Sequence, residues 1–263
     1  MFAFQTISDL ATIGDGASII SRLINFPKTI RYCFNRYCKR NIKVAVYGAS
    51  GVGKSQFLNT ITNTYQFSTV RTRKLTKREL VLKSGRKIVF IDTPGHQSIK
   101  MVREKVISDI YKGKLDGIIN VVNYGYNDGE DLEIDKAFKT GTNVVKQSYL
   151  SDNRRKEIIN TKEFIEAITN EAKLKWVLTI VNKADIWYND LNKVMEYYEG
   201  GDYGAILSKL SHATKIRTLP FCSLISPFAN KPMTIIFGDK EKYAYFAELY
   251  DCLDSLVNHY KDV

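Results

Sequence analysis

The sequence predicts an α/β fold in which a mainly parallel β-sheet is covered by helices on both faces. From residue 41 onward, short apolar runs typical of buried strands alternate with longer segments in which apolar residues recur at helical spacing. Such alternation is typical of strand–helix–strand units. Hydrophobic residues make up 44% and charged residues 25% of the 263 residues, which is the balance of a folded globular chain.

The expected strands coincide with the short apolar runs. They lie at 42–47, 79–83, 87–91, 117–122, 175–181 and 218–224. The second and third flank Ser84-Gly85, a dipeptide that favours a hairpin. Most of the others are continuous apolar stretches, which indicates strands buried on both faces.

The expected helices follow from apolar residues at helical spacing. They lie at 54–61, 98–112, 153–172 and roughly 187–210, and a closing helix carries a stripe from Phe246 to Tyr260. Residues 124–150 are polar and irregular. Helical spacing recurs at 16–40, so we predict a basic helical extension at 1–40 and a main domain at 41–263.

The net charge of +11 is concentrated near the amino terminus of the sequence. Residues 1–78 contain thirteen Lys or Arg and two Asp, whereas residues 79–263 contain 26 basic and 26 acidic residues. Six of the thirteen lie at 19–40, among Ile, Phe and Tyr. This segment suits packing on the main domain or an acidic protein, an anionic membrane surface, or a nucleic acid. We favour them in that order, because no RNA-binding module is recognisable.

Composition argues against several classes of protein. No run of about 18 apolar residues is present, so no transmembrane helix is expected. The four cysteines are too few for a disulfide framework, and none forms a C-x-x-C pair typical of structural zinc. We therefore expect a reducing, cytoplasmic compartment, with peripheral membrane contact as an addition.

Residues 48–55 (GASGVGKS) match the phosphate-loop pattern G-x-x-x-x-G-K-[ST] between a predicted strand and a predicted helix. The glycines let successive backbone N–H groups face one phosphate, and the helix amino terminus favours the anion. Lys54 is expected on the β and γ phosphates, and the Ser55 hydroxyl on Mg²⁺. The expected nucleotide contacts in this region are Gly48, Ser50, Gly51, Val52, Gly53, Lys54, Ser55 and Gln56.

Asp92-Thr93-Pro94-Gly95 follows the strand at 87–91. Asp92 is expected to hold the metal ion through water, and the Gly95 N–H to sense the γ-phosphate. An ordinary strand-to-loop turn is an equally good explanation of DTPG alone. The motifs on either side of it therefore decide how it is interpreted.

Asn182-Lys183-Ala184-Asp185 follows the strand at 175–181. The Asp185 carboxylate can accept hydrogen bonds from the ring N–H and exocyclic amine of guanine, and adenine has no matching pair of donors. Asn182 would support the base, and the aliphatic part of Lys183 would cover its face. This segment therefore favours GTP over ATP.

The order GASGVGKS, DTPG, NKAD resembles that of TRAFAC-class P-loop GTPases, which include Ras-like, Era-like and translation-factor-like G domains. The resemblance rests on 16 motif residues, and the order of strands and helices extends it across residues 41–263. It implies a three-layer G domain with a six-stranded sheet, GTP/GDP and Mg²⁺ as ligands, and slow hydrolysis coupled to switch-loop rearrangement.

The resemblance also assigns roles around the γ-phosphate. The switch I threonine, which binds Mg²⁺ and contributes to catalysis, is expected at Thr72, with Thr69 and Thr76 as alternatives. His96 occupies the position of a residue that orients the attacking water. Gln97 is the adjacent fallback for that role, and a solvent-facing loop histidine is the other interpretation of His96.

Two further features depart from a minimal G domain. The last guanine-binding loop is expected at Ser223 and Leu224, within one residue of register. Asp92 and Asn182 lie 90 residues apart, farther than in a minimal domain, which predicts an inserted loop near 124–152. Its start is acidic, which favours a solvated turn over a metal site; the acidic residues are Asp128, Glu130, Asp131, Glu133 and Asp135.

The sequence thus predicts a slow GTPase that acts as a nucleotide-dependent switch, with GTP as substrate and a protein effector or regulator as partner. An anionic membrane surface is a second partner class, and RNA is less favoured. The alternative is a GTP/GDP-binding scaffold with negligible turnover that binds a membrane, RNA or an acidic protein through the basic segment. Asp185 argues against an ATP-dependent enzyme.

Overall fold

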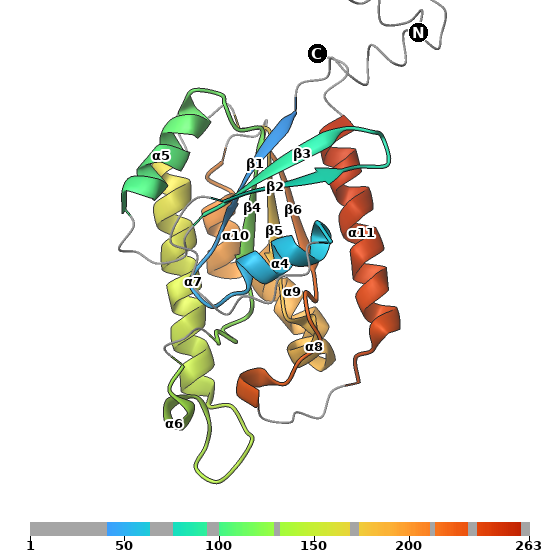
Figure 1. Ribbon diagram of the computed structural model, residues 1–263. Helices are drawn as coiled ribbons and strands as arrows, with labels where there is room; N and C mark the ends of the chain where they lie inside the picture. Colours follow the sequence, from blue (N-terminus) through green and yellow to red (C-terminus); the bar gives the residue numbers. More distant parts are fainter. Residues whose placement is uncertain are drawn as a thin grey trace, which may run out of the picture. The chain divides into compact units, whose positions relative to one another are not determined.

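The computed structural model describes residues 41–63, 76–93, 100–128, 132–168, 174–210, 214–230 and 236–258. Within these ranges six strands form one sheet in the order β2-β3-β1-β4-β5-β6 (Figure 1). The strands are β1 (Ile42–Tyr47), β2 (Thr76–Val81), β3 (Lys87–Asp92), β4 (Gly117–Val122), β5 (Trp176–Val181) and β6 (Lys215–Pro220). Only the β2–β3 pair is antiparallel, which confirms the predicted mainly parallel sheet.

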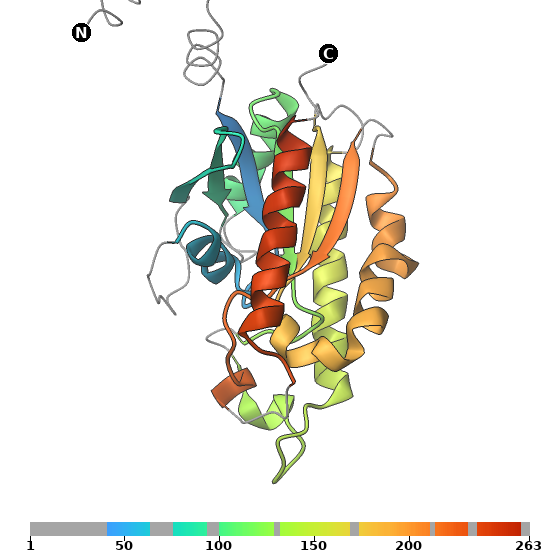
Figure 2. The same cartoon turned by 90° about the vertical axis from the view of Figure 1, so that its right-hand side faces the viewer.

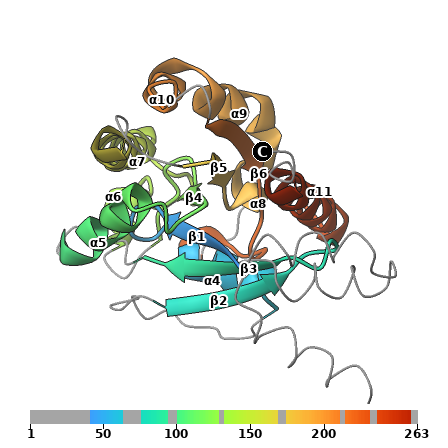
Figure 3. The same ribbon diagram turned by 90° about the horizontal axis from the view of Figure 1, so that it is seen from above.

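Helices cover both faces of this sheet. One face carries α5 (Lys100–Tyr111), α7 (Gln147–Ile168), α9 (Leu191–Glu199) and α10 (Gly201–Leu207). The opposite face carries α4 (Lys54–Ile61) and α11 (Asp239–Asn258), and Figure 2 shows α11 running along the sheet. The view from above separates the two helical layers (Figure 3). The short elements are α6 (Ile134–Ala137), α8 (Ala184–Trp187), η1 (Tyr188–Asp190) and η2 (Phe228–Asn230).

Each face of the sheet has its own hydrophobic core. Every residue of β4 and β5 is buried, because helices shield both sides of these central strands. One core contains Phe164 of α7 and Tyr198 of α9, and the other contains Phe57 of α4 and Leu253 of α11. The apolar stripes predicted for these helices therefore face the sheet.

The segment between β4 and α7 has a small core of its own. Phe138 and Val145 form an isolated antiparallel bridge, and both pack with Leu150 and with Phe228 of η2. The predicted loop at 124–152 is therefore partly ordered by α6 and by the first turns of α7, which begins at Gln147 rather than near residue 153.

The last strand lies earlier than predicted. β6 pairs with β5 from Lys215 to Pro220, so the prediction of a strand at 218–224 is wrong at both ends. β6 is an edge strand with mixed burial, and its polar residues lack the apolar signal of a central strand. The last hydrogen bond to β5 comes from the N–H of Phe221, which donates to the Val181 carbonyl oxygen at 2.9 Å, and the loop at 221–226 follows.

The other elements agree with the predicted bounds to within a few residues, apart from two helical segments. The predicted stretch at 187–210 is divided among α8, η1, α9 and α10, and the closing helix begins at Asp239, before the stripe that starts at Phe246. The strands at 42–47 and 117–122 and the helix at 54–61 have the predicted bounds. The extension predicted at 1–40 lies outside the described residues, and the compact unit described here begins at Asn41. Among the helices that the structure describes, none is long and apolar enough to cross a membrane.

Gly117 gives a test of the packing between β4 and β5. A Cβ atom at Gly117 would lie 2.2–2.4 Å from ring atoms of the buried Trp176. Gly117→Ala is therefore expected to lower the free energy of unfolding by about 1–3 kcal/mol, measured by urea denaturation. Gly238→Ala is the control, since its Cβ would meet only the end of the Glu241 side chain, at 3.3 Å. Equal stability of the two variants would contradict this packing.

Candidate functional site

The sequence motifs meet where the parallel strands end. β1 leads into residues 48–53, β3 ends at Asp92, β5 leads into Asn182, and β6 leads into the loop at 221–226. These strands run in the same direction, so their carboxyl ends share one edge of the sheet. In open α/β sheets this edge is where ligands bind.

All three glycines of the loop at 48–53 have positive φ values, and two of them, Gly48 and Gly53, also leave no room for a Cβ atom. Gly48 and Gly53 have φ values of 143° and 90°. A Cβ atom at Gly48 would lie 2.2 Å from the Val121 carbonyl oxygen, and one at Gly53 would lie 2.6 Å from Asn182 Nδ2. The loop is therefore wrapped tightly against the ends of β4 and β5, as a phosphate-binding loop requires.

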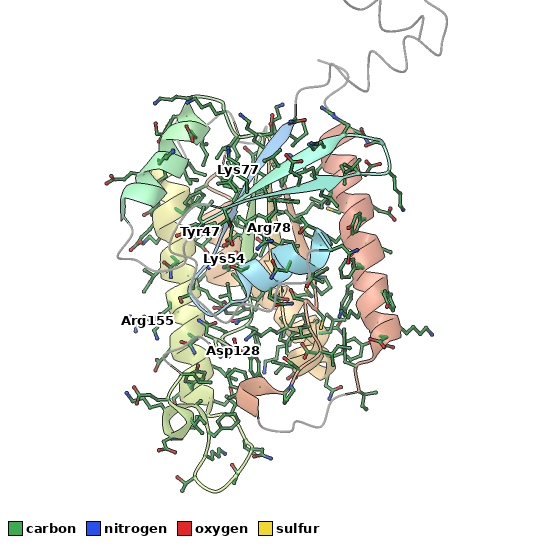
Figure 4. All side chains as sticks on the ribbon, in the orientation of Figure 1. Tyr47, Lys54, Lys77, Arg78, Asp128 and Arg155 are labelled. Carbon is green, nitrogen blue, oxygen red and sulfur yellow. The ribbon has the colours of Figure 1, made fainter. Side chains whose placement is uncertain are left out.

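Lys54 is buried within this loop, at the start of α4 (Figure 4). Its Nζ donates hydrogen bonds to the carbonyl oxygens of Gly48 at 2.9 Å and Ala49 at 2.7 Å. Burial lowers the pKa of Lys54 to about 8, and the negative charge of Asp92 opposes part of this shift. A phosphate would give this buried ammonium group a strong charge partner.

Ser55 and Asp92 lie beside each other at the same end of the loop. The Ser55 hydroxyl donates to Asp92 Oδ2 at 2.9 Å, and Asp92 is buried. A hydroxyl and a carboxylate are the oxygen ligands that Mg²⁺ accepts, with water and phosphate oxygens completing its shell. The pair therefore fits the metal role predicted for it. No group of three or more His, Cys, Asp or Glu able to hold a metal occurs in the ranges that the structure describes.

Asn182 joins the phosphate loop to the loop after β6. Its Nδ2 donates to the Val52 carbonyl oxygen at 3.1 Å. Its Oδ1 accepts from the N–H of Ser223 at 3.1 Å and from the Ser223 hydroxyl at 2.9 Å. Ser223 therefore acts through Asn182, and Leu224, the other residue predicted in this loop, is exposed.

Asp185 lies at the amino-terminal end of α8 and is 1% exposed. Its Oδ2 accepts from the Ser226 N–H at 3.0 Å, and its Oδ1 accepts from the Cys222 thiol at 3.5 Å. Burial raises the pKa of Asp185, against the effect of these two hydrogen bonds and of the Lys183 charge. Each carboxylate oxygen has two lone pairs, so the carboxylate keeps the capacity to accept two donors from a base.

Lys183 has a left-handed backbone with φ of 62°. Its Nζ donates to the Tyr126 carbonyl oxygen at 2.8 Å and pairs with Asp128 Oδ1 at 2.5 Å. Burial lowers the pKa of Lys183, and Asp128 is the largest opposing influence. Asp128 therefore belongs to this ionic contact, and the prediction of a simple solvated acidic turn is incomplete at this residue.

Sequence reasoning missed two groups at this edge of the sheet. The Ser226 N–H contacts Asp185, and the side chain of Asn123 reaches the Gly51 carbonyl oxygen at 3.4 Å. Neither lies in a recognised motif, whereas Cys222, which also contacts Asp185, lies within one residue of the loop predicted at Ser223 and Leu224. The position of Asn123 directly after β4 was the available signal, since every other parallel strand end here carries a site residue.

The structure leaves some predicted residues undescribed. Thr69, Thr72, Gly95, His96 and Gln97 lie outside the described ranges. Thr76, the third switch I candidate, is the exposed first residue of β2 and pairs with Asp92 in the β2–β3 register. Ser50 and Gln56 belong to the loop and to α4, respectively, and both are partly buried.

Comparison with known proteins agrees with this geometry. Residues 43–183 match the family described as 50S ribosome-binding GTPase. No curated protein sequence matches the chain. The solved structure of the mammalian SRP receptor is 15% identical, with a TM-score of 0.50, and the alignment covers 81% of this chain and 99% of that one. The FeoB G-domain from Methanococcus jannaschii is 16% identical, with a TM-score of 0.47 and coverage of 83% and 99%.

The family match spans more than half of the chain and includes the phosphate loop, DTPG and the first two residues of NKAD. The SRP receptor likeness independently shows the fold. The arrangement of the strand ends agrees with both, and the buried Lys54 lies in the phosphate loop that the family match includes. The chain therefore belongs to the 50S ribosome-binding GTPase family, and it is a GTP-binding P-loop GTPase domain of the TRAFAC class.

Proposed function

We propose that this protein hydrolyses GTP to GDP and phosphate and changes its partner binding with the nucleotide state. One observation carries the proposal. Asn182 connects a phosphate loop containing the buried Lys54 to the loop beside the buried Asp185. This hydrogen-bonded connection supports the proposal that the two loops hold the two ends of one guanine nucleotide.

The guanine end would be selected by the charge and burial of Asp185. Its carboxylate would accept from the ring N–H and the exocyclic amine of guanine, replacing the water that burial removes. Adenine would leave the same carboxylate without donors, which is costly in a buried site. Lys183 would cover the base with its aliphatic part, while Tyr126 and Asp128 hold its ammonium group.

The phosphate end would be held by backbone N–H groups of residues 48–53 and by Lys54. Ser55 would ligate Mg²⁺, and Asp92 would hold it directly or through water. When bound, the metal ion would neutralise charge that develops on the phosphates. Lys54 would leave the carbonyl oxygens of Gly48 and Ala49 and turn its ammonium group towards the β and γ phosphates.

Hydrolysis requires water in line with the γ-phosphate. In this proposal His96 orients that water, Thr72 and the Gly95 N–H sense the γ-phosphate, and loss of phosphate releases both switch segments. The motif order and the family membership support these roles. Intrinsic turnover of such a site is slow, on the order of 10⁻⁴ to 10⁻² s⁻¹.

For partners, we propose a protein effector or regulator that recognises the nucleotide state. The basic charge of residues 1–78 supports an acidic partner surface, and an anionic membrane is the second candidate. This proposal places the protein in the cytoplasm, with peripheral membrane contact in the second case. Salt-dependent co-sedimentation with anionic vesicles or with RNA separates these from a protein partner.

Asp185→Asn tests the guanine contact. Replacing one carboxylate oxygen by an amino group places a donor against the exocyclic amine of guanine, so GTP affinity should fall by about 100-fold. Xanthine has a carbonyl at that position, so the variant should bind XTP more tightly than the wild-type protein does. Fluorescence titration with both nucleotides measures this exchange, and unchanged GTP affinity would remove Asp185 from the site.

Lys54→Met separates folding from nucleotide binding. The pKa of Lys54 falls from 10.5 to about 8 on folding, so below pH 8 the charged form destabilises the folded chain. The nucleotide-free variant should therefore be more stable at pH 7, by about 3 kcal/mol at most, and the gain should shrink as the pH rises from 8 towards 10. Calorimetry should show no GDP binding by the same variant, and retained affinity would contradict the phosphate role.

His96→Ala tests the hydrolytic step. The variant should bind GTP with unchanged affinity because His96 would contact the attacking water rather than the nucleotide. Single-turnover hydrolysis should slow by about 10-fold or more. Gln97→Ala is the neighbouring control, and a loss confined to that variant would transfer the role to Gln97. If the wild-type protein binds GTP but shows no turnover, the scaffold interpretation replaces the switch.

A further inference from the structure

A stripe of polar side chains on α7 faces the loop that follows β4. Tyr149, Asn153 and Glu157 are spaced four residues apart, so they lie on one face of the helix. We call residues 123–128 the linking loop. Tyr149 donates its hydroxyl to the Asn127 carbonyl oxygen, and Asn153 Nδ2 donates to the Gly125 carbonyl oxygen at 3.1 Å. One face of α7 thus forms hydrogen bonds with successive residues of the same loop.

Glu157 makes the most extensive contact in this stripe. Its Oε1 accepts from the N–H groups of Asn123 and Gly125, both at 3.2 Å. Its Oε2 accepts from the Tyr198 hydroxyl at 2.5 Å, and that hydroxyl in turn accepts from the Tyr124 N–H at 2.8 Å. The carboxylate therefore organises three consecutive backbone N–H groups of the linking loop, two directly and one through Tyr198.

The linking loop has an unfavourable backbone conformation, which the hydrogen bonds from α7 and Tyr198 must stabilise. Tyr124 and Gly125 both have positive φ values, of 58° and 86°. A Cβ atom at Gly125 would lie 2.4 Å from the Leu150 carbonyl oxygen, so the loop backbone lies directly on α7. A non-glycine residue in the left-handed region costs about 1 kcal/mol, and the surrounding contacts must supply it.

The opposite side of the linking loop contacts both nucleotide motifs. Asn123 Nδ2 donates to the Gly51 carbonyl oxygen at 3.4 Å, and the Asp128 N–H reaches the same oxygen at 3.5 Å. Lys183 binds the Tyr126 carbonyl oxygen and the Asp128 carboxylate. Figure 4 labels Lys54 at the start of α4 and Asp128 on the loop below it.

We propose that Glu157 is a positioning residue of the guanine-nucleotide site, which acts through the linking loop to fix Gly51 in the phosphate loop and Lys183 over the base. The inference rests on the proposed function, since it places a nucleotide against these two residues. Glu157 itself lies one layer behind the site and contacts no residue of the phosphate loop. Its role is to keep nucleotide release slow.

The ionised form of Glu157 suits this role. A carboxylate accepts from all three donors that face it, whereas a proton on Oε2 would face the donating Tyr198 hydroxyl. Burial raises the pKa of Glu157 to about 7, against the hydrogen bonds from Tyr198, Asn123 and Gly125. The other titratable groups that influence the carboxyl or are influenced by it are Arg154, Lys183, Tyr197 and Tyr203.

The first experiment measures release of a fluorescent GDP from the full chain at pH 8. Glu157→Ala should release GDP about 10-fold faster than wild type. Glu157→Gln should give an intermediate rate, because its amide oxygen still accepts from the two N–H groups. The matched control is Glu163→Gln, the same change at an exposed position of α7. Rates of both Glu157 variants equal to wild type would overturn the proposal.

The pH profile separates positioning from simple structural support. Wild-type release should quicken as the pH falls from 8 to 6, and Glu157→Gln should flatten this profile. The groups that contact the nucleotide titrate in both proteins, so the difference reports on Glu157. The pKa of Glu157 is higher in the folded chain than its ordinary value of 4.5, so the ionised carboxylate destabilises the fold above pH 7. Glu157→Gln should therefore be no less stable than the wild-type protein above pH 7. Parallel profiles in the two proteins would overturn the proposal.

Asp128→Asn tests the same route from the other side of the loop, without altering a buried core position. Asp128→Asn should release GDP faster than wild type. In the Glu157→Gln/Asp128→Asn double variant, the increase in release rate should be smaller than the product of the two single increases. Independent effects that multiply would overturn a shared route. Asp152→Asn on the exposed face of α7 is the control. Failure of the proposed function would be seen separately, because the wild-type protein would then not bind GDP or would not hydrolyse GTP. Failure of the Glu157 proposal would be seen in a wild-type protein that does both.

Discussion

The site depends on the side chain of Asn182. A parallel sheet brings strand ends to one edge, but sheet hydrogen bonds stop at those ends and leave the following loops unconnected. Asn182 supplies the connection, because its amide group donates to Val52 in one loop and accepts twice from Ser223 in another. Its backbone is fixed as well, with the N–H on Val122 and the carbonyl oxygen bonded by Trp187. A residue with only donors or only acceptors could not join both loops.

Several ionisable side chains near Asn182 are buried, although burial of a charged group is unfavourable in a folded protein. Burial lowers the pKa values of Lys54 and Lys183 and raises those of Asp185 and Glu157. In each case the charged form is destabilised by loss of water, so the site weakens the fold in the absence of ligand. The two lysines and Asp185 lie in the candidate nucleotide site, where a nucleotide would supply the phosphate charge and the base donors. Glu157 has its partners within the protein, which is consistent with a supporting position behind the site.

Sequence predicted the parts of this structure that are specified locally. The central strands are continuous apolar runs and the motifs follow them directly, so fold and site location were both accessible. β6 was misplaced because an edge strand lacks that signal. The polar stripe on α7 could not be predicted from the sequence. In the sequence Glu157 resembles any polar helical residue, and its role depends on a contact with Asn123, 34 residues away. The role of Asp128 likewise depends on its ion pair with Lys183, 55 residues later in the sequence.

Local strain in the backbone shows where the site is most tightly determined. Lys183 and Tyr124 are non-glycine residues with φ near 60°, a region that disfavours side chains with a Cβ. Both belong to the same contact system, since Lys183 binds Tyr126 and Asp128 while the Tyr124 N–H is held by Tyr198. The backbone on either side of Lys183 is held separately, by the Asn182 N–H on the Val122 carbonyl oxygen and the Ala184 N–H on the Phe221 carbonyl oxygen. Backbone hydrogen bonds therefore hold the left-handed conformation of Lys183, and its contacts with Tyr126 and Asp128 fix the direction of the side chain that extends from it.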